Sequence, residues 1–264
     1  MSAVHIDHVT KIYPGHSARD APVLALDDVS LDIADREFCT IIGHSGCGKT
    51  TLLNLLAGFE QPTAGSIDVD GTPVGAPTWM RSMVFQDYAL FPWLTVEQNI
   101  SFGLEMKKVA RAERQAVIAA QIRLVGLAGF EKRYPHQLSG GMKQRVSIAR
   151  ALSVEPQVLL MDEPFAALDA QNRALMQQEM GRLLAEADAA SRRTMVLVTH
   201  SIEEAIILSD RIVVLSSRPG RVKEILRVDL ARPRDEDDPS FIALRHRLRV
   251  LINEDIAIQR ESAP

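Results

Sequence analysis

The chain has 264 residues, of which 46% are hydrophobic and 24% are charged, enough for one large α/β domain or a domain with a satellite. Its formal net charge of −4 at pH 7 argues against a nucleic-acid partner, because nucleic-acid binding calls for a clustered basic excess. The spacing of its two cysteines, Cys39 and Cys47, fits neither a disulfide framework nor a zinc site and predicts a reducing compartment.

Neither a signal peptide nor a membrane span is predicted. The N-terminal sequence MSAVHIDHVT lacks the charged lead and the apolar run of a signal peptide. The longest apolar runs fall far short of the roughly 18 residues that cross a bilayer. We therefore expect a soluble chain that is able to sit on a membrane partner.

The N-terminal part of the chain predicts a sheet with one face in water. Polar and apolar residues alternate loosely in residues 4–13 and 24–33, and glycines bound a short strand at 65–71. Such alternation is typical of antiparallel strands that have one solvent-facing side.

Three nearly continuous apolar runs, at 38–42, 157–162 and 194–199, predict a different kind of strand. Runs this short and this apolar are typical of central parallel strands that helices cover on both faces. A fourth run, at 211–216, extends the same sheet. Because open parallel sheets bind ligands beyond the carboxyl ends of their strands, the residues that follow each run are candidates for a site.

A phosphate-binding pattern follows the first of these runs. The sequence GHSGCGKTT fits G-x-x-x-x-G-K-[ST], which chance would produce only about 0.01 times in such a chain, and it leads into a helix. Its glycines let backbone N–H groups face a phosphate, Lys49 supplies a positive charge, and Thr50 places a hydroxyl on Mg²⁺. The candidate nucleotide-binding residues are Gly43, His44, Ser45, Gly46, Cys47, Gly48, Lys49, Thr50 and Thr51.

The middle of the chain predicts a helical subdomain inserted into the α/β core. Apolar residues recur at three- and four-residue spacing in 96–108, 111–127 and 140–152, with no strand-like run between them. The predicted parts are 1–86 with 156–217 for the core, 87–155 for the helical insert and 218–264 for a short C-terminal extension. Further helices are predicted at 171–187, 201–208 and 239–252.

The sequence QLSGGMKQR, at 137–145, predicts a second anion site within the helical insert. Ser139 is a good helix N-cap, and Gly140 and Gly141 leave backbone N–H groups uncovered at the start of that helix. One phosphate group has no obvious need of two separated sites in the same chain. If two copies pair head to tail, the glycines of one would close over the nucleotide of the other, in an isologous pairing.

Acids follow the second buried run, and a histidine follows the third. A buried carboxylate is costly unless it meets a cation, so Asp162 is predicted to hold Mg²⁺ and Glu163 to act as general base on the attacking water. The alternative is a pair of helix-capping acids before Pro164. His200 is predicted to face the γ-phosphate, and the alternative is a hydrogen-bonded core histidine.

In this order the motifs resemble those of the ATP-binding subunit of an ABC transporter, from about residue 4 to about residue 222. The match includes the phosphate loop, the signature LSGGM with Met142 where glutamine is commonest, the strand end LLMDEP, the ALD loop around Asp169, and VTH. The resemblance implies a P-loop NTPase core, mainly a parallel sheet flanked by helices, with an N-terminal antiparallel β-subdomain and an inserted α-helical subdomain.

The resemblance also implies a shared ATP site. In this family two ATP molecules lie between two subunits, each held by the phosphate loop of one subunit and the signature of the other, and Asp169 helps to link the two sites. Gln86 matches a glutamine that contacts Mg²⁺ and water, and Tyr13 matches an aromatic that stacks on adenine. Core packing is the alternative for Tyr13. ATP and Mg²⁺ are thus the implied ligands, and a homodimer is the implied assembly.

The sequence FQDYALFPWL, at 85–94, gathers four aromatic residues in a chain that is only 5% aromatic. In the family this segment lines a groove that receives a short cytoplasmic helix of the membrane subunit, and aromatic residues anchor such interfaces well. The alternative is core packing, which we expect for Phe85 and Leu90. The residues expected to dock a transmembrane permease subunit are Tyr88, Phe91 and Trp93.

The sequences FPWLTVEQNI and LSSRPGRV resemble the importer branch that serves nitrate, sulfonates, taurine and related small solutes. This implies an indirect partnership with a periplasmic or extracellular solute-binding protein and a place at the cytoplasmic face of the inner (plasma) membrane. Two alternatives stay open: a soluble ABC-type ATPase without a membrane partner, and a P-loop kinase acting on a small metabolite. The kinase would leave the signature, Gln86 and His200 without a role.

Overall fold

The computed structural model describes residues 2–15, 21–166 and 193–261, with side chains as far as 254, and parts of the intervening segment. In that segment the described residues are 168, 169, 171, 173, 174, 176, 177, 180 and 181. The helix predicted at 171–187 therefore lies largely outside the described residues.

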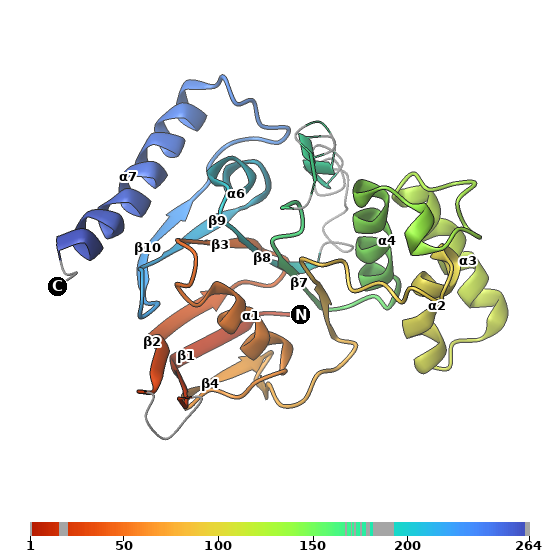
Figure 1. The fold of residues 1–264 in the computed structure, drawn as a ribbon, viewed down its shortest axis with the longest axis horizontal. Helices are drawn as coiled ribbons and strands as arrows, with labels where there is room; N and C mark the ends of the chain where they lie inside the picture. Colours follow the sequence, from red (N-terminus) through yellow and green to blue (C-terminus); the bar gives the residue numbers. More distant parts are fainter. Residues whose placement is uncertain are drawn as a thin grey trace.

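An antiparallel sheet forms the N-terminal part of the molecule (Figure 1). Its strand order is β2-β1-β4-β5, and every neighbouring pair is antiparallel. The three strands predicted from alternation are confirmed, and the fourth has only two residues, too few for a pattern to reveal. The bounds are β1 (Val4–Tyr13), β2 (Val23–Ile33), β4 (Ala64–Val69) and β5 (Thr72–Pro73).

A second sheet has the strand order β10-β9-β3-β8-β7-β6 and is parallel except for the pair β9–β10. All residues of β3 and β7 are buried, which explains their continuous apolar runs. The order places β3, β8 and β7 next to one another, so their carboxyl ends meet at one edge. The bounds are β3 (Phe38–Ile42), β6 (Arg81–Val84), β7 (Val158–Asp162), β8 (Thr194–Thr199), β9 (Arg211–Leu215) and β10 (Val222–Arg227).

Helix α1 (Lys49–Ala57) packs between the two sheets. Its leucines are fully buried in an apolar cluster that takes residues from β1, β2 and β4 on one side and from β3, β8 and β9 on the other. Because this helix begins at the phosphate-binding pattern, the burial of its apolar side fixes the pattern at the sheet edge.

The helices of the predicted insert lie together at one end of the molecule (Figure 1). They share an apolar cluster of their own, with Ile100, Ile122 and Val146 at its centre. A reciprocal pair of hydrogen bonds between Thr95 and Gln98 caps the first of them. The bounds are α2 (Val96–Met106), α3 (Arg111–Leu124), a short 3-10 helix (Pro135–Gln137) and α4 (Gly140–Ser153). The division of the chain into three parts stays a prediction.

Two helices complete the other end of the molecule. Helix α6 (Ile202–Leu208) follows β8, and α7 (Pro239–Glu261) runs nine residues beyond the predicted end at 252. Phe241 and Leu248 of α7 are fully buried against α6 and β9. The C-terminal extension is thus part of the core packing beside the carboxyl end of β3.

Candidate active site

The loop between β3 and α1 has a backbone that only glycine adopts easily. Gly46 and Gly48 have φ angles of 77° and 94°, in the left-handed region. A Cβ on Gly48 would also lie only 2.9 Å from the carbonyl oxygen of Ala25. Gly48 is the N-cap of α1, and no side chain caps this helix and no acid occupies its first turn. Its N-terminal N–H groups are therefore available to an anion.

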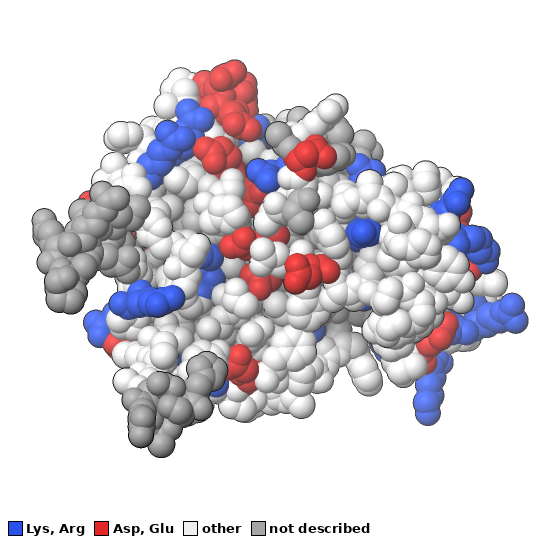
Figure 2. Space-filling model, viewed as in Figure 1, with Lys and Arg blue, Asp and Glu red and all other residues white. Residues whose placement is uncertain are grey.

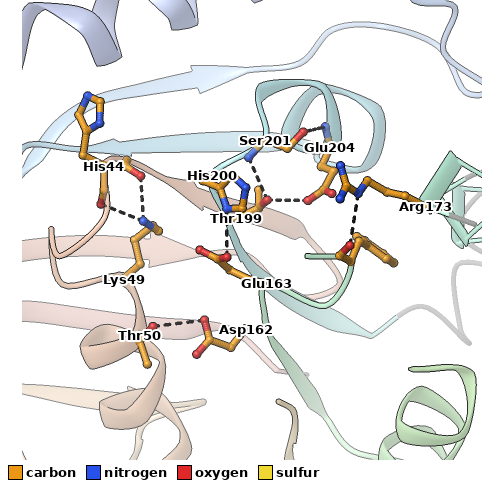
Figure 3. A network of polar contacts seen from close by, with 12 residues as sticks. His44, Lys49, Thr50, Asp162, Glu163, Arg173, Thr199, His200, Ser201 and Glu204 are labelled. Atoms are coloured by element: carbon orange, nitrogen blue, oxygen red, sulfur yellow. Dashed lines mark hydrogen bonds and ion pairs between the residues drawn. The ribbon is translucent and has the colours of Figure 1, made fainter. Parts of the chain in front are cut away.

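Lys49 is folded back onto the phosphate loop (Figure 3). Its ammonium group donates hydrogen bonds to the carbonyl oxygens of Gly43 and His44, at 2.8 and 2.9 Å. The side chain is only 6% exposed, so the positive charge is held inside the loop. This position is suited to a phosphate that the loop surrounds.

Two predicted loop residues turn their side chains away from the cavity side. The Nε2 atom of His44 lies 2.8 Å from the carbonyl oxygen of Ile252 in α7, so the imidazole ties the loop to the C-terminal helix. Cys47 is buried in the apolar cluster around α1, as a small filler. These two residues therefore contribute their backbone groups, and not their side chains, to the predicted phosphate site.

Thr50 and Asp162 meet at the start of α1 and the end of β7. The Thr50 hydroxyl donates to Oδ1 of Asp162 over 3.3 Å (Figure 3). Burial raises the pKa of the Asp162 carboxyl, while the hydrogen bond from Thr50 and the charge of Lys49 act in the opposite direction. A hydroxyl and a carboxylate, both oxygen donors, fit a hard divalent cation such as Mg²⁺.

Glu163 and His200 come together from the ends of two neighbouring strands. Oε2 of Glu163 lies 3.0 Å from Nδ1 of His200 (Figure 3). Glu163 has a φ of 43°, which is rare for a residue with a side chain and is tolerated mainly where the surroundings fix it. Here its N–H donates to the carbonyl oxygen of Val198, at 2.9 Å. The sheet therefore holds the carboxylate and the imidazole in contact.

A cavity of about 610 Å³ opens at the phosphate loop. Its walls come from β1, β2, the phosphate loop, the segment after β6, the end of β7 and the turn after β9. Of the predicted site residues it brings together Tyr13, Gln86, Glu163 and loop residues 45, 46 and 48–51. Its lining also includes β2 residues 23–25 and Arg218, which the sequence did not predict as site residues.

Tyr13 stands at the rim of this cavity. Its hydroxyl donates to Glu60 at 2.9 Å and lies 3.4 Å from the Thr51 hydroxyl, and the Lys11 ammonium lies 5.0 Å from the ring centre. Burial raises the pKa of the phenol. The hydroxyl is thus anchored, and the ring stays among the cavity residues.

The second predicted anion site does not line this cavity. Ser139 caps α4, with its hydroxyl accepting a hydrogen bond from the N–H of Met142 at 3.3 Å. Gly140 and Gly141 form the first turn of the same helix. Neither these residues nor Asp169 are among the described residues that line the cavity. A single chain therefore leaves the signature apart from the phosphate loop.

The aromatic stretch lies beside an apolar groove of about 450 Å³ whose lining includes Phe85 and Phe91. Phe91 packs against Phe102 and Trp93, with ring centres 4.5 and 5.6 Å apart, and Trp93 is 69% exposed. Tyr88 is half-buried, and the expected burial of Phe85 and Leu90 is only half realised. The reason is that Phe85 forms a wall of the groove, while Leu90 packs at the edge of the helical cluster.

Charge is unevenly spread over the face drawn in Figure 2. Acidic side chains form one group near its centre and another at its top edge, and the described Lys and Arg side chains are scattered over the face and its left and right edges. Among the described helices, none combines the length and the hydropathy needed to cross a membrane.

Comparisons of the sequence with known proteins identify its family and several relatives. Residues 26–166 match the ABC transporter family. The chain is 46% identical to an uncharacterized ABC transporter ATP-binding protein, MJ0412, of Methanocaldococcus jannaschii, over 95% of this chain and 91% of that one. It is 43% identical to the bicarbonate transport ATP-binding protein CmpC of Synechococcus elongatus. It is 45% identical to the nitrate import ATP-binding protein NrtC of the same organism. The matches cover 98% and 92% of this chain but only 39% and 37% of CmpC and NrtC.

Two solved structures share the fold. The dimeric ATP-binding cassette MJ0796, in a post-hydrolysis state bound to ADP and Pi, superposes with a TM-score of 0.73 and 31% identity. A second dimeric structure of this bacterial ABC transporter cassette gives a TM-score of 0.74 and 30% identity. Each match covers 85% of this chain and 98% of the other. The predicted α/β P-loop NTPase fold is confirmed.

Proposed function

Because this chain belongs to the ABC transporter family of ATP-binding subunits, we propose that two copies of it bind and hydrolyse ATP to drive a membrane importer. The chain is an ATPase of this family. The observation that carries the proposal is the single cavity that gathers Lys49, Thr50, Gln86 and Glu163 from separate segments. The alternatives, a small-molecule kinase and a soluble ATPase, find no counterpart among the relatives compared.

The phosphate loop and α1 would hold the triphosphate of ATP. Backbone N–H groups of the loop and the Lys49 ammonium would donate to the β and γ phosphates. Thr50, Asp162 and Gln86 would hold Mg²⁺, which supplies neutralisation of the phosphate charge. The ring of Tyr13, which is among the residues lining the cavity, would stack on adenine.

Glu163 and His200 would act at the γ-phosphate. The Glu163 carboxylate would accept a proton from the attacking water, as general base. His200, in contact with that carboxylate, would donate to the γ-phosphate and hold the closed arrangement. Ser139, which caps α4, is not among the described residues that line this cavity, so it is given no role at the nucleotide of its own chain.

The signature is therefore proposed to serve the cavity of a second copy. Ser139, Gly140 and Gly141 sit at a helix N-terminus outside the cavity of their own chain, where uncovered N–H groups favour an anion. The dimeric form of the similar cassette MJ0796 supports such a pairing. Asp169 would lie near the junction of the two sites.

The apolar groove beside the aromatic stretch is proposed to dock a permease subunit at the cytoplasmic face of the membrane. Trp93 is largely exposed and packs on Phe91, which lines the groove. Gln86 belongs to the same short segment and lines the ATP cavity, so this segment joins the two surfaces. The solute is proposed to be nitrate, a sulfonate, taurine or a related small solute delivered by a solute-binding protein. The names of the relatives CmpC and NrtC support this class.

Changing Trp93 to Ala is expected to weaken assembly with the permease by roughly tenfold or more, because an exposed aromatic anchor is lost. ATP binding by the isolated subunit is expected to stay unchanged, since Trp93 does not line the ATP cavity. The measurement is co-purification of each variant with its permease, together with ATP affinity. Phe130→Ala removes another exposed aromatic side chain, one that neither lines the groove nor packs on Phe91 among the ring contacts of the described residues, and serves as the control. Full assembly of the Trp93 variant would reject this docking site.

A further inference from the structure

The segment Ser216–Arg221, which joins β9 to β10, is a tight and internally bonded turn. The Ser216 hydroxyl donates to the carbonyl oxygen of Pro219 at 2.9 Å and accepts from the N–H of Arg221 at 3.0 Å. The Ser216 N–H also donates to the carbonyl oxygen of Arg221 at 2.9 Å. The turn thus has one defined shape, which includes the RPG sequence.

Gly220 wedges this turn between β2 and the phosphate loop. Its N–H donates to the carbonyl oxygen of Ala25, and its own carbonyl oxygen accepts from Asp27, both at 3.0 Å. A Cβ at this position would collide with the backbone carbonyl oxygen of Cys47. The absence of a side chain therefore lets the turn touch the phosphate loop directly.

This contact places Arg218 over the phosphate loop. Nε of Arg218 donates to the carbonyl oxygen of Gly46 at 3.3 Å, and a Cβ on Gly46 would lie 2.7 Å from Nη2. The guanidinium group lines the same cavity as Lys49 and Thr50. The hydrogen bond to Gly46 uses one of its five donors, no other donor bonds a described residue, and Arg218 is exposed.

The order of the strands places Arg218 on the opposite side of the loop from the proposed hydrolytic pair. Arg218 follows β9, which pairs with one edge of β3. His200 and Glu163 follow β8 and β7, on the other edge of β3. Arg218 would therefore approach a nucleotide in this cavity from the side away from the proposed position of the γ-phosphate.

Among the described residues, the charged members of the cavity lining are Lys49, Arg218 and Glu163. The Lys49 ammonium is already engaged with two carbonyl oxygens of the loop. A triphosphate carries several negative charges, and a guanidinium group matches phosphate oxygens in two-pronged geometry. Arg218 is the second cation of the lining and keeps donors available for this purpose.

We propose that Arg218 is a nucleotide-binding residue whose guanidinium group holds the phosphates that ATP and ADP share. This inference rests on the proposed ATP site. The competing role is structural: Arg218 would merely fasten the turn to the carbonyl oxygen of Gly46. The two roles differ in their dependence on charge, because a neutral amide is able to keep the fastening hydrogen bond.

Calorimetry at low and high salt separates these two roles. It measures the affinities for ATP and for ADP of three variants, Arg218→Ala, Arg218→Gln and Arg218→Lys. The Ala and Gln variants are expected to lose roughly tenfold in affinity for both nucleotides, and the Lys variant less. The loss should shrink as salt rises, because salt screens an exposed charge. Thermal melting without nucleotide checks that each variant is folded.

Arg221→Gln is the matched control. Arg221 belongs to the same turn, pairs with Asp27 and does not line the cavity, so its change should leave both affinities unaltered. Three results would overturn the proposal. They are full affinity in the Arg218→Gln variant, a loss of affinity that does not change with salt, and an equal loss of affinity in the Arg221 variant. If Lys49→Ala abolishes binding while the Arg218 variants bind normally, only this inference fails. If neither change matters, the proposed ATP site itself fails.

Discussion

Replacing Glu163 with Gln is expected to lower the rate of ATP hydrolysis by about 10²–10⁴-fold while leaving ATP binding intact. The amide has the size of the carboxylate and is still able to contact His200, but it does not accept a proton from water. The measurement is phosphate release under saturating ATP and Mg²⁺, with ATP affinity determined in parallel.

Glu203→Gln is the control for this change. Glu203 is an acid at the start of α6, three residues after His200, and it does not line the cavity, so its loss should leave turnover near normal. Normal turnover in the Glu163 variant would reject this residue as the general base. An equal fall in the Glu203 variant would point instead to the net charge of the region.

Changing Lys49 to Ala is expected to weaken ATP binding itself, by roughly 100-fold or more, because the positive charge beside the phosphates and its charge-assisted hydrogen bonding are lost. The ammonium is almost fully buried inside the loop, whereas Arg218, the other cation among the described lining residues, is exposed. Calorimetric titration with ATP measures the loss, and turnover should fall with it at low ATP.

Lys132→Ala is the control for the loss of a lysine, since Lys132 forms an exposed ion pair with Glu97 far from the phosphate loop. Melting of the Lys49 variant without nucleotide reports whether the loop has lost its shape along with its bonds to Gly43 and His44. A folded Lys49 variant that binds ATP as tightly as the unchanged chain would contradict the proposed site.

The buried strands of the core follow directly from their sequences, whereas the edge strands do not. β3, β7 and β8 are covered on both faces, so each reads as one apolar run. β6 has three half-buried residues and only one buried residue, Val84, and β10 mixes charged and apolar positions at a sheet edge. Such edge strands depend on pairing with a neighbour, which local periodicity does not encode.

The site shows the same division between local and long-range information. The phosphate loop and the acids after β7 are visible in the sequence because each occupies consecutive positions. Arg218 is a polar residue in a turn, and its approach to Gly46 depends on contacts of Gly220 with β2 and with the loop. Likewise, the imidazole of His44 contacts the carbonyl oxygen of Ile252 in α7, which lies 208 residues away in sequence.

The pairing of two chains around ATP is tested most directly by the mass in solution of the Glu163→Gln protein. With ATP and Mg²⁺ we expect the mass of two chains, and without nucleotide the mass of one, because slow hydrolysis leaves each ATP held by a phosphate loop and the opposing signature. Adding Lys49→Ala to this variant should abolish the pairing. Only single chains in the presence of ATP and Mg²⁺, even with the permease supplied, would contradict a site shared between two copies.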